Sequence, residues 1–280
     1  MLKTRVITAV IALIPMLWIL LYGNPLVIKV FFTALVGLSA YEMAAMIFPA
    51  LYSRLGEKAA ANPIVAPRWL RFVTILLSCS LYASLEFTEA PVIGYAGLVL
   101  LGAILIGIFA APSVELSFAN ASGFVTSIVY SVFPWIAILA LYARGADARY
   151  LLFLCVVVWC GDTGAYFAGR SLGKRKLAPR MSPNKTWEGA IGGIVASVIG
   201  GLCLRAYYGD DFMSLPLVVG SSVFGGIFGQ LGDLTESSFK RFSGVKDSGS
   251  IFPGHGGFLD RVDGLLFAAP VIWFILHQFS

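Results

Sequence analysis

Long apolar runs alternate with short polar segments along the whole chain. Runs such as 6–22 and 31–48 continue without a charged residue over most of their length, and a membrane-spanning helix needs about 20 mostly apolar residues. The pattern predicts nine spans, at residues 6–22, 26–48, 70–86, 92–110, 121–142, 150–169, 189–207, 213–232 and 263–279.

Composition excludes a soluble globular protein. Of the 280 residues, 58% are hydrophobic and only 12% are charged, whereas soluble domains carry about 25% charged residues. In lipid only helices or a closed barrel satisfy every backbone polar group, and the long continuous runs lack the alternation of barrel strands. We therefore expect an all-α, polytopic integral membrane protein with a single membrane domain over 1–280. Residues 1–149 would hold the N-terminal spans, and residues 150–280 the C-terminal spans with the catalytic motifs.

The distribution of basic residues predicts an orientation. The loops after the even-numbered spans carry 14 of the 20 Lys and Arg residues, and such loops stay in the cytoplasm. Lys3 and Arg5 indicate the opposite orientation for the first span, because basic residues before a first apolar run also prefer the cytoplasmic side. The net charge of +5 suits contact with anionic membrane lipids rather than nucleic acid.

Asp162 lies within the sixth predicted span, flanked by Gly161 and Gly164. An ionised carboxylate there is costly without a partner, and such residues are usually functional. One interpretation is an ion pair with Arg170 or a hydrogen bond to a neighbouring helix. The other, which we favour, is a ligand for a cation or a sugar hydroxyl.

The loop after the sixth span is basic and ends in the segment S-P-N-K-T-W-E-G at 182–189. Ser182, Asn184 and Lys185 place hydroxyl, amide and ammonium donors where the seventh span begins, and a helix N-terminus with such donors suits a phosphate. Ordinary N-capping by Asn184 or Thr186 explains the same residues equally well.

Two pairs of carboxylates lie at the ends of neighbouring spans. Asp233 and Glu236 are three residues apart, as are Asp260 and Asp263, so each pair shares one helix face. The second pair also suits the start of a helix. Because spans eight and nine are antiparallel, the four groups can converge on a divalent cation, and all-oxygen ligands favour Mg²⁺.

Basic residues and glycines separate the two carboxylate pairs. Lys240, Arg241 and Lys246 can neutralise phosphate charge, and the glycines at 254, 256 and 257 permit close backbone approach to an anion. His255 among them is either a phosphate donor or structural. Together these residues indicate phosphoryl or nucleotidyl transfer, which depends on positioning and charge neutralisation.

The run S-F-K-R-F-S-G-V-K-D-S-G-S-I-F-P-G-H-G-G-F-L-D-R-V-D, residues 238–263, resembles the signature of the phosphatidate cytidylyltransferases, or CDP-diacylglycerol synthases. The likeness extends to Gly161-Asp162-Thr163, to the 182–189 segment and to G-Q-L-G-D-L-T-E-S at 229–237. The N-terminal half is similar only in hydropathy and layout.

The resemblance implies that CTP and phosphatidic acid react to give CDP-diacylglycerol and pyrophosphate, with Mg²⁺ and possibly K⁺ as a second ion. It assigns metal binding to Asp233 and Asp260, with Asp263 and Glu236 as second candidates. Phosphate neutralisation would fall to Lys240, Arg241, Lys246 and Arg261. Substrate contacts would come from Ser182, Asn184, Lys185, Asp162, Ser238, His255, Gly256 and Gly257. The resemblance also implies a homodimer, and a bacterial cytoplasmic (inner) membrane location with the active site facing the cytoplasm is expected.

Three alternatives remain to be weighed. A secondary transporter would suit Asp162, but the sequence has no repeat symmetry and its polar residues gather at one face. A second alternative is another CTP-dependent lipid enzyme: the 238–263 run argues against a polyprenol kinase, whereas a cytidylyltransferase for a different lipid acid stays open, because the run does not fix the acyl chains. A CDP-alcohol phosphotransferase would show D-G-x-x-A-R followed by spaced aspartates, a pattern that is absent.

Overall fold

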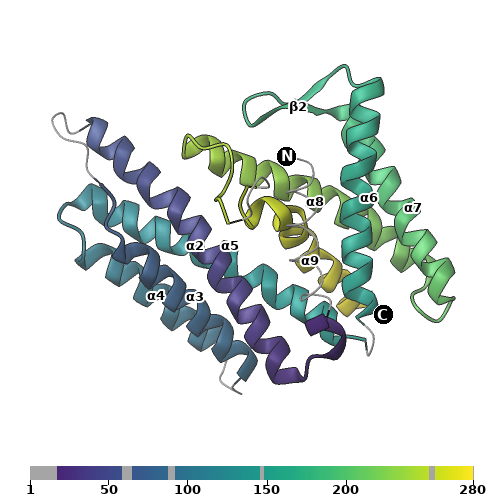
Figure 1. Ribbon diagram of the computed structural model, residues 1–280, viewed down its shortest axis with the longest axis horizontal. Helices are drawn as coiled ribbons and strands as arrows, with labels where there is room; N and C mark the ends of the chain where they lie inside the picture. Colours follow the sequence, from purple (N-terminus) through teal and green to yellow (C-terminus); the bar gives the residue numbers. More distant parts are fainter. Residues whose placement is uncertain (1–17, 59–64, 88–91, 146–147, 252–255, 280) are drawn as a thin grey trace. The chain divides into compact units, whose positions relative to one another are not determined.

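The computed structural model describes residues 18–58, 65–87, 92–145, 148–251 and 256–279, and helices dominate these residues (Figure 1). One short antiparallel hairpin interrupts them. The elements are α2 (Pro25–Lys58), α3 (Trp69–Phe87), α4 (Val92–Phe109), α5 (Val114–Ala143), α6 (Arg149–Leu172), β1 (Lys176–Ala178), β2 (Ser182–Thr186), α7 (Trp187–Tyr208), α8 (Leu215–Phe242) and α9 (Leu259–Phe279).

The predicted all-α membrane architecture is confirmed. Six of the described helices, α2, α5, α6, α7, α8 and α9, are long and apolar enough to cross a membrane. The count of nine spans is not confirmed. Most of the first predicted span, 6–22, lies outside the described residues, and α4 offers only the shorter apolar helix Ile93–Phe109.

The two C-terminal helices extend further into the polar segments than the hydropathy pattern predicts. Helix α8 continues to Phe242 instead of ending at 232, and α9 begins at Leu259 rather than at 263. The end of α8 is fixed by Gly244, whose φ of 67° is left-handed. The Val245 amide donates to the Lys240 carbonyl, and the Gly244 amide to Arg241. These bonds form a Schellman motif, so all four carboxylates of the predicted pairs lie on helices.

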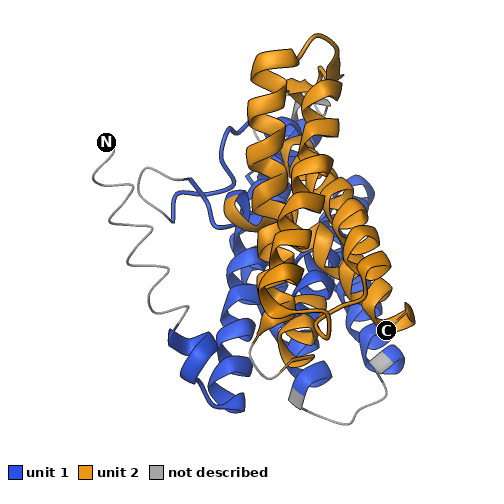
Figure 2. Ribbon diagram, turned by 90° about the vertical axis from the view of Figure 1, so that its right-hand side faces the viewer, with its two compact units in different colours: residues 1–136, 239–260 blue, residues 137–238, 261–280 orange. Residues whose placement is uncertain are grey.

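The chain forms two compact units that are each assembled from separate segments (Figure 2). Unit 1 comprises residues 1–136 and 239–260, and unit 2 comprises residues 137–238 and 261–280. In unit 1, α2 packs on α3 and α3 on α4. Phe48 of α2 and Phe124 of α5 meet edge to face with ring centroids 5.2 Å apart in its core.

Unit 2 is built on a close approach of α6 and α7. A Cβ at Gly161 would overlap the Ser197 hydroxyl, and one at Gly164 would overlap Ala196. Ser197 Oγ donates to the Val157 carbonyl across the pair at 2.8 Å. Small residues and interhelical hydrogen bonds of this kind hold helices together in lipid, where the hydrophobic effect between them is lost.

The hairpin was predicted as a loop, but it is a small sheet in which Ala178 pairs with Ser182. Thr186 ends β2 and serves as the N-cap of α7, its hydroxyl accepting from the Gly189 amide at 3.1 Å. The Glu188 carboxylate accepts from the amides of Lys174 and Arg175 on the opposite arm. The hairpin is therefore fixed to the first turn of α7.

Candidate active site

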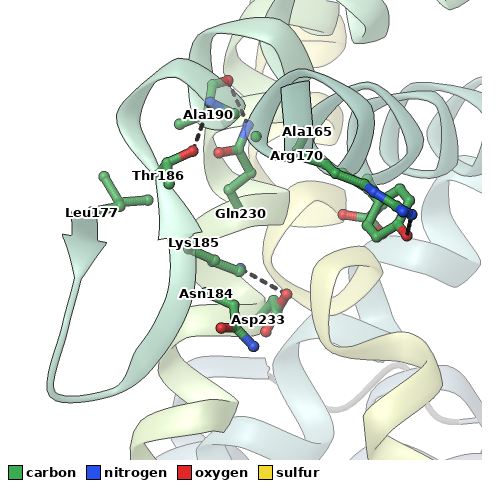
Figure 3. Close-up of a pocket in the computed structure, with 13 residues that line it drawn as sticks. Ala165, Arg170, Leu177, Asn184, Lys185, Thr186, Ala190, Gln230 and Asp233 are labelled. Atoms are coloured by element: carbon green, nitrogen blue, oxygen red, sulfur yellow. Dashed lines mark hydrogen bonds and ion pairs between the residues drawn. The ribbon is translucent and has the colours of Figure 1, made fainter. Parts of the chain in front are cut away.

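A cavity of about 460 Å³ lies in unit 2, between the hairpin and three helices (Figure 3). Its polar lining residues come from α6, β2 and α8, and its small residues from α6 and α7. The lining comprises Asp162, Ala165, Tyr166, Gly169, Arg170, Leu177, Asn184, Lys185, Thr186, Gly189, Ala190, Gln230 and Asp233. The structure thus brings together Asp162, Asn184, Lys185 and Asp233, which come from three separate motifs of the sequence.

An ion pair joins the hairpin to α8 at this cavity. Lys185 Nζ lies 2.6 Å from Asp233 Oδ2, with both side chains partly exposed. Ser237, one turn further along α8, donates to Asp233 Oδ1 at 3.3 Å. Asp233 is therefore held by one cation and one hydroxyl while remaining accessible.

Asp162 faces the same ion pair. It lines the cavity and lies near enough to Asp233 and Lys185 to interact electrostatically with both. Among the described residues it forms no ion pair with Arg170, whose guanidinium instead donates to the Tyr166 hydroxyl at 2.9 Å. The prediction of an ion pair between Asp162 and Arg170 is therefore wrong, and Asp162 lies instead near the Lys185–Asp233 pair.

Two further carboxylates of unit 2 lie close to Asp233. Asp263 hydrogen bonds to Glu236 and interacts electrostatically with both Glu236 and Asp233, and Glu236 is fully buried. Gly232 permits this approach, because a Cβ there would overlap the Asp263 carbonyl. The sequence prediction that the ends of α8 and α9 bring carboxylates together is confirmed for these three residues.

The donor set in unit 2 fits Mg²⁺ in chemical type. The described residues contain no ready-made group of three acidic, histidine or cysteine ligands around one point. Mg²⁺, however, is usually bound by one or two carboxylates together with substrate phosphates and waters. Asp233, Glu236 and Asp263 can supply the one or two carboxylates that such a site needs. Metal binding by these residues stays a prediction.

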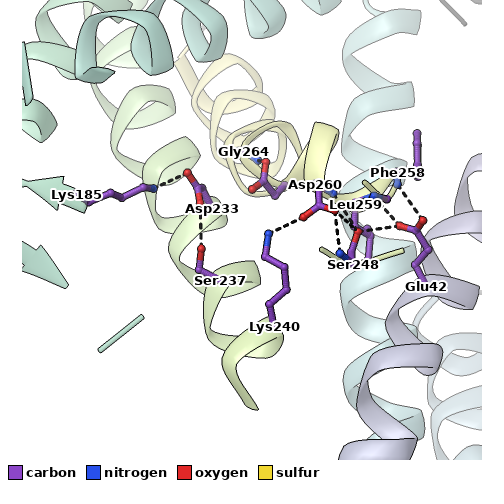
Figure 4. A network of polar contacts seen from close by, with 12 residues as sticks. Glu42, Lys185, Asp233, Ser237, Lys240, Ser248, Phe258, Leu259, Asp260 and Gly264 are labelled. Atoms are coloured by element: carbon purple, nitrogen blue, oxygen red, sulfur yellow. Dashed lines mark hydrogen bonds and ion pairs between the residues drawn. The ribbon is translucent and has the colours of Figure 1, made fainter. Parts of the chain in front are cut away.

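Asp260 belongs to a separate network in unit 1 (Figure 4). Its Oδ1 lies 2.6 Å from Lys240 Nζ. Its Oδ2 accepts from the Ser248 amide at 2.8 Å, the Ser248 hydroxyl at 2.9 Å and the Gly257 amide at 2.9 Å. Both oxygens are thus engaged by protein donors, and a metal ion bound here would have to displace one of them. The predicted metal role of Asp260 is untested.

A carboxylate that the sequence analysis did not select completes this network. Glu42, in the middle of α2, is 1% exposed. Its oxygens accept from the amides of Phe258 and Leu259, each at 2.9 Å, and lie 3.1 Å from the Ser248 hydroxyl. The rule that singled out Asp162, a carboxylate within a predicted span, applies equally to Glu42 and would have found it.

The remaining predicted residues differ in their exposure and position. Arg241, Lys246 and Arg261 are exposed, Ser238 is partly buried on α8, and Ser182 is paired in the sheet and does not line the cavity. Gly256 adopts a left-handed φ of 82°. His255 lies outside the described residues.

Tyr166 and Gln230 line the cavity but were not predicted. Gln230 belongs to the G-Q-L-G run quoted above, and its side-chain amide donates to the Ala190 carbonyl.

Comparison with known proteins gives a consistent result. The profile of the cytidylyltransferase family matches residues 3–279. A phosphatidate cytidylyltransferase of Staphylococcus epidermidis is 37% identical over 282 residues, which cover 99% of each chain. Enzymes of the same name from Staphylococcus aureus and Staphylococcus saprophyticus are 36% identical over 283 residues, with the same coverage.

Proposed function

Because the chain belongs to the cytidylyltransferase family, we propose that it makes CDP-diacylglycerol and pyrophosphate from CTP and phosphatidic acid. A phosphate oxygen of phosphatidic acid attacks the α-phosphorus of CTP, a new P–O bond forms, and the bond to the β-phosphate oxygen breaks. The nucleophile is already an anion, so no strong general base is required. Similarity to the named relatives over 99% of the chain is the main support.

The cavity of unit 2 supplies groups suited to a phosphate-bearing substrate. Lys185 and Arg170 provide positive charge, and Asn184 provides amide donors. Lys185 is paired with Asp233. We propose that an incoming phosphate takes over part of this pairing, so that Lys185 neutralises phosphate charge and Asp233 becomes available to a cation.

Asp233, with Glu236 and Asp263 beside it, would hold Mg²⁺, and K⁺ is the expected second ion. When bound, Mg²⁺ supplies positive charge that offsets the charge of the triphosphate. Lys240, Arg241, Lys246 and Arg261 are the proposed additional cations for the phosphates, and positioning with charge neutralisation accounts for catalysis of this type. Asp260 keeps Lys240 in place through their ion pair.

The proposal is tested by turnover of the purified protein. Radiolabelled CTP and phosphatidic acid in mixed micelles should give labelled CDP-diacylglycerol and pyrophosphate in equal amounts, and omission of phosphatidic acid should abolish both. Consumption of CTP without a lipid product would contradict the proposed reaction. Solute uptake into vesicles without CTP turnover would support a transporter instead.

We further propose that the active site faces the cytoplasm of a bacterial inner membrane and that the protein is a homodimer. Ser250 is exposed in the segment between α8 and α9. A Ser250→Cys variant, made after the four native cysteines are replaced, should react with an impermeant thiol reagent only after the cytoplasmic face is opened. Labelling of intact spheroplasts would reverse the orientation. Light scattering of the purified protein measures the mass of the assembly.

A further inference from the structure

Glu42 is a buried carboxylate that the proposed reaction does not use. It lies on α2, within a helix long enough to span a membrane, and is 1% exposed. A carboxylate in such a position is costly unless other groups satisfy it. Its partners come from more than 200 residues away in the sequence, in the segment between α8 and α9 and at the start of α9.

The Glu42 carboxylate occupies the N-terminal end of α9. Each of its two oxygens accepts from one backbone amide, Phe258 N or Leu259 N, at 2.9 Å (Figure 4). The first amides of a helix have no partner within the helix, and the helix dipole favours negative charge beside them. Glu42 therefore caps α9 from a distant helix, a position that a nearby Ser, Thr, Asp or Asn commonly fills.

The fit around this carboxylate is tight. A Cβ at Gly249 would overlap Glu42 Oε1, and a Cβ at Gly257 would lie closer to the same oxygen than ordinary van der Waals contact. Gly249 therefore leaves room for Glu42 itself, whereas Gly257 leaves room first for Ser248 Oγ and the Gly249 amide, and then for Glu42 Oε1. The predicted substrate contact of Gly257 stays a prediction.

Ser248 connects Glu42 to the Lys240–Asp260 pair. The Ser248 hydroxyl lies 3.1 Å from Glu42 Oε2 and 2.9 Å from Asp260 Oδ2. Asp260 in turn pairs with Lys240 at 2.6 Å. Glu42, Ser248, Asp260 and Lys240 thus form one continuous chain of contacts, and all four residues belong to unit 1.

We propose that Glu42 is a positioning residue for the transferase reaction. Its carboxylate holds Ser248 and the first turn of α9, and through them it sets the position of Asp260 and of the Lys240 ammonium group. This inference rests on the proposed function, because it assigns Lys240 to phosphate neutralisation. Glu42 itself contacts no substrate in this scheme.

The central experiment compares Glu42→Gln with Ser39→Ala. The Gln variant keeps the size of the side chain, but it removes the charge and replaces one acceptor oxygen with an NH₂ group that faces a backbone N–H. We expect kcat per folded molecule to fall about 10- to 100-fold, the range typical of groups that orient a functional ligand, with the KM for CTP changed less than threefold.

Ser39→Ala is the matched control. Ser39 lies one turn before Glu42 on α2, is fully buried, accepts from Trp135 Nε1 at 2.9 Å and donates to the Leu35 carbonyl at 2.9 Å, and these hydrogen bonds do not involve Glu42 or Ser248. Its loss should lower the melting temperature while kcat stays within twofold of the wild type. Equal loss of kcat in both variants would mean that any damage to α2 has this effect, and would overturn the proposal.

A double-mutant cycle with Ser248→Ala tests the route of the effect. If Glu42 acts through Ser248, the double variant should be no slower than the slower single variant, because residues of one network are not additive. If kcat of the double variant falls by the product of the two single-variant losses, Glu42 does not act through Ser248. If Glu42→Gln yields no folded protein, Gly249→Ala places a methyl group against the same carboxylate and should lower kcat, and unchanged kcat would overturn the proposal.

The two proposals fail in different ways. If the wild-type protein makes no CDP-diacylglycerol, the proposed function is wrong. If the wild type is active and Glu42→Gln is equally active per folded molecule, only the positioning role is wrong.

Discussion

Lys185 Nζ lies 2.6 Å from Asp233 Oδ2, so a strand of the hairpin and a membrane helix meet through one ion pair. Both residues line the cavity of unit 2, and Asp162 interacts electrostatically with both. One lysine on the cavity wall thus pairs with one carboxylate and lies near a second. The ion pair therefore ties the basic hairpin to an acidic position of α8.

Loss of the Lys185 charge should weaken catalysis. Hydrogen bonds to charged groups contribute about 1.5–3 kcal/mol, so Lys185→Gln should lower kcat/KM for CTP or phosphatidic acid about 10- to 100-fold. Lys176→Gln is the matched control, because Lys176 is an exposed residue of the same hairpin that does not line the cavity. Steady-state kinetics with each substrate varied in turn would measure the effect. Equal losses in the two variants would point to general attraction of anionic lipid by the hairpin.

Turnover should depend on a divalent cation and on Asp233. Treatment with a chelator should abolish CDP-diacylglycerol formation, and Mg²⁺ should restore it. Asp233→Asn should lower kcat at saturating Mg²⁺ by about 100-fold or more, the scale found when a group that stabilises transition-state charge is removed. Substitution of Na⁺ for K⁺ in the assay shows whether a second ion is needed.

Asp210→Asn provides the control for this prediction. Asp210 also belongs to unit 2 and pairs with Arg205 at 2.6 Å, but its side chain is 85% exposed. Its neutralisation should leave turnover and the Mg²⁺ requirement unchanged. Full activity of chelated protein, or normal kinetics of Asp233→Asn, would remove Asp233 from the proposed metal site.

The fold class could be predicted from the sequence because the length of the apolar runs is enough to indicate membrane-spanning helices. Runs such as 121–142 and 150–169 correspond to α5 and α6. The ends of helices were predicted less well, since hydropathy marks where lipid contact stops and not where helical hydrogen bonding stops. Helix α8 continues ten residues past its predicted end, through Asp233 and Glu236 to Phe242.

The candidate site was predicted where residues are close in sequence and missed where they are distant. Asp233 and Asp263 were expected to approach each other because α8 and α9 are consecutive antiparallel helices. The contact of Glu42 with Ser248 joins residues 206 positions apart, and no local pattern encodes such a pairing. Spacing arguments also did not predict that Asp260 pairs with Lys240 and Ser248, whereas Asp233 pairs with Lys185.

The seam between α6 and α7 should tolerate no added methyl group at Gly164. A Cβ there would overlap Ala196, and overpacking of a tight interface costs about 1–3 kcal/mol. Gly164→Ala should therefore lower the free energy of unfolding and the melting temperature in detergent. Because α6 and α7 line the cavity, the enzymatic activity should fall together with the melting temperature.

Gly220→Ala is the matched control for this seam. Gly220 lies on α8, and a methyl group added to it would have open space around it, with no neighbouring helix of the described residues within 4 Å. Ala is also favoured over Gly within a helix by about 0.5–1 kcal/mol. This variant should be as stable as the wild type or slightly more stable. A lower melting temperature for Gly220→Ala than for Gly164→Ala would contradict the packing explanation.

The Lys240–Asp260 pair should respond unequally to loss of its two members. The side chains are 15% and 9% exposed, and removal of one partner from a buried pair costs up to about 3–5 kcal/mol. Lys240→Gln leaves Asp260 with three other donors, from Ser248 and Gly257, so its cost should lie below that range. Asp260→Asn places an NH₂ group among those donors, where it can accept from none of them, so it should be the more destabilising. Thermal unfolding of both variants in the same detergent measures the order, and a greater loss for Lys240→Gln would show that Asp260 does not organise the segment between α8 and α9.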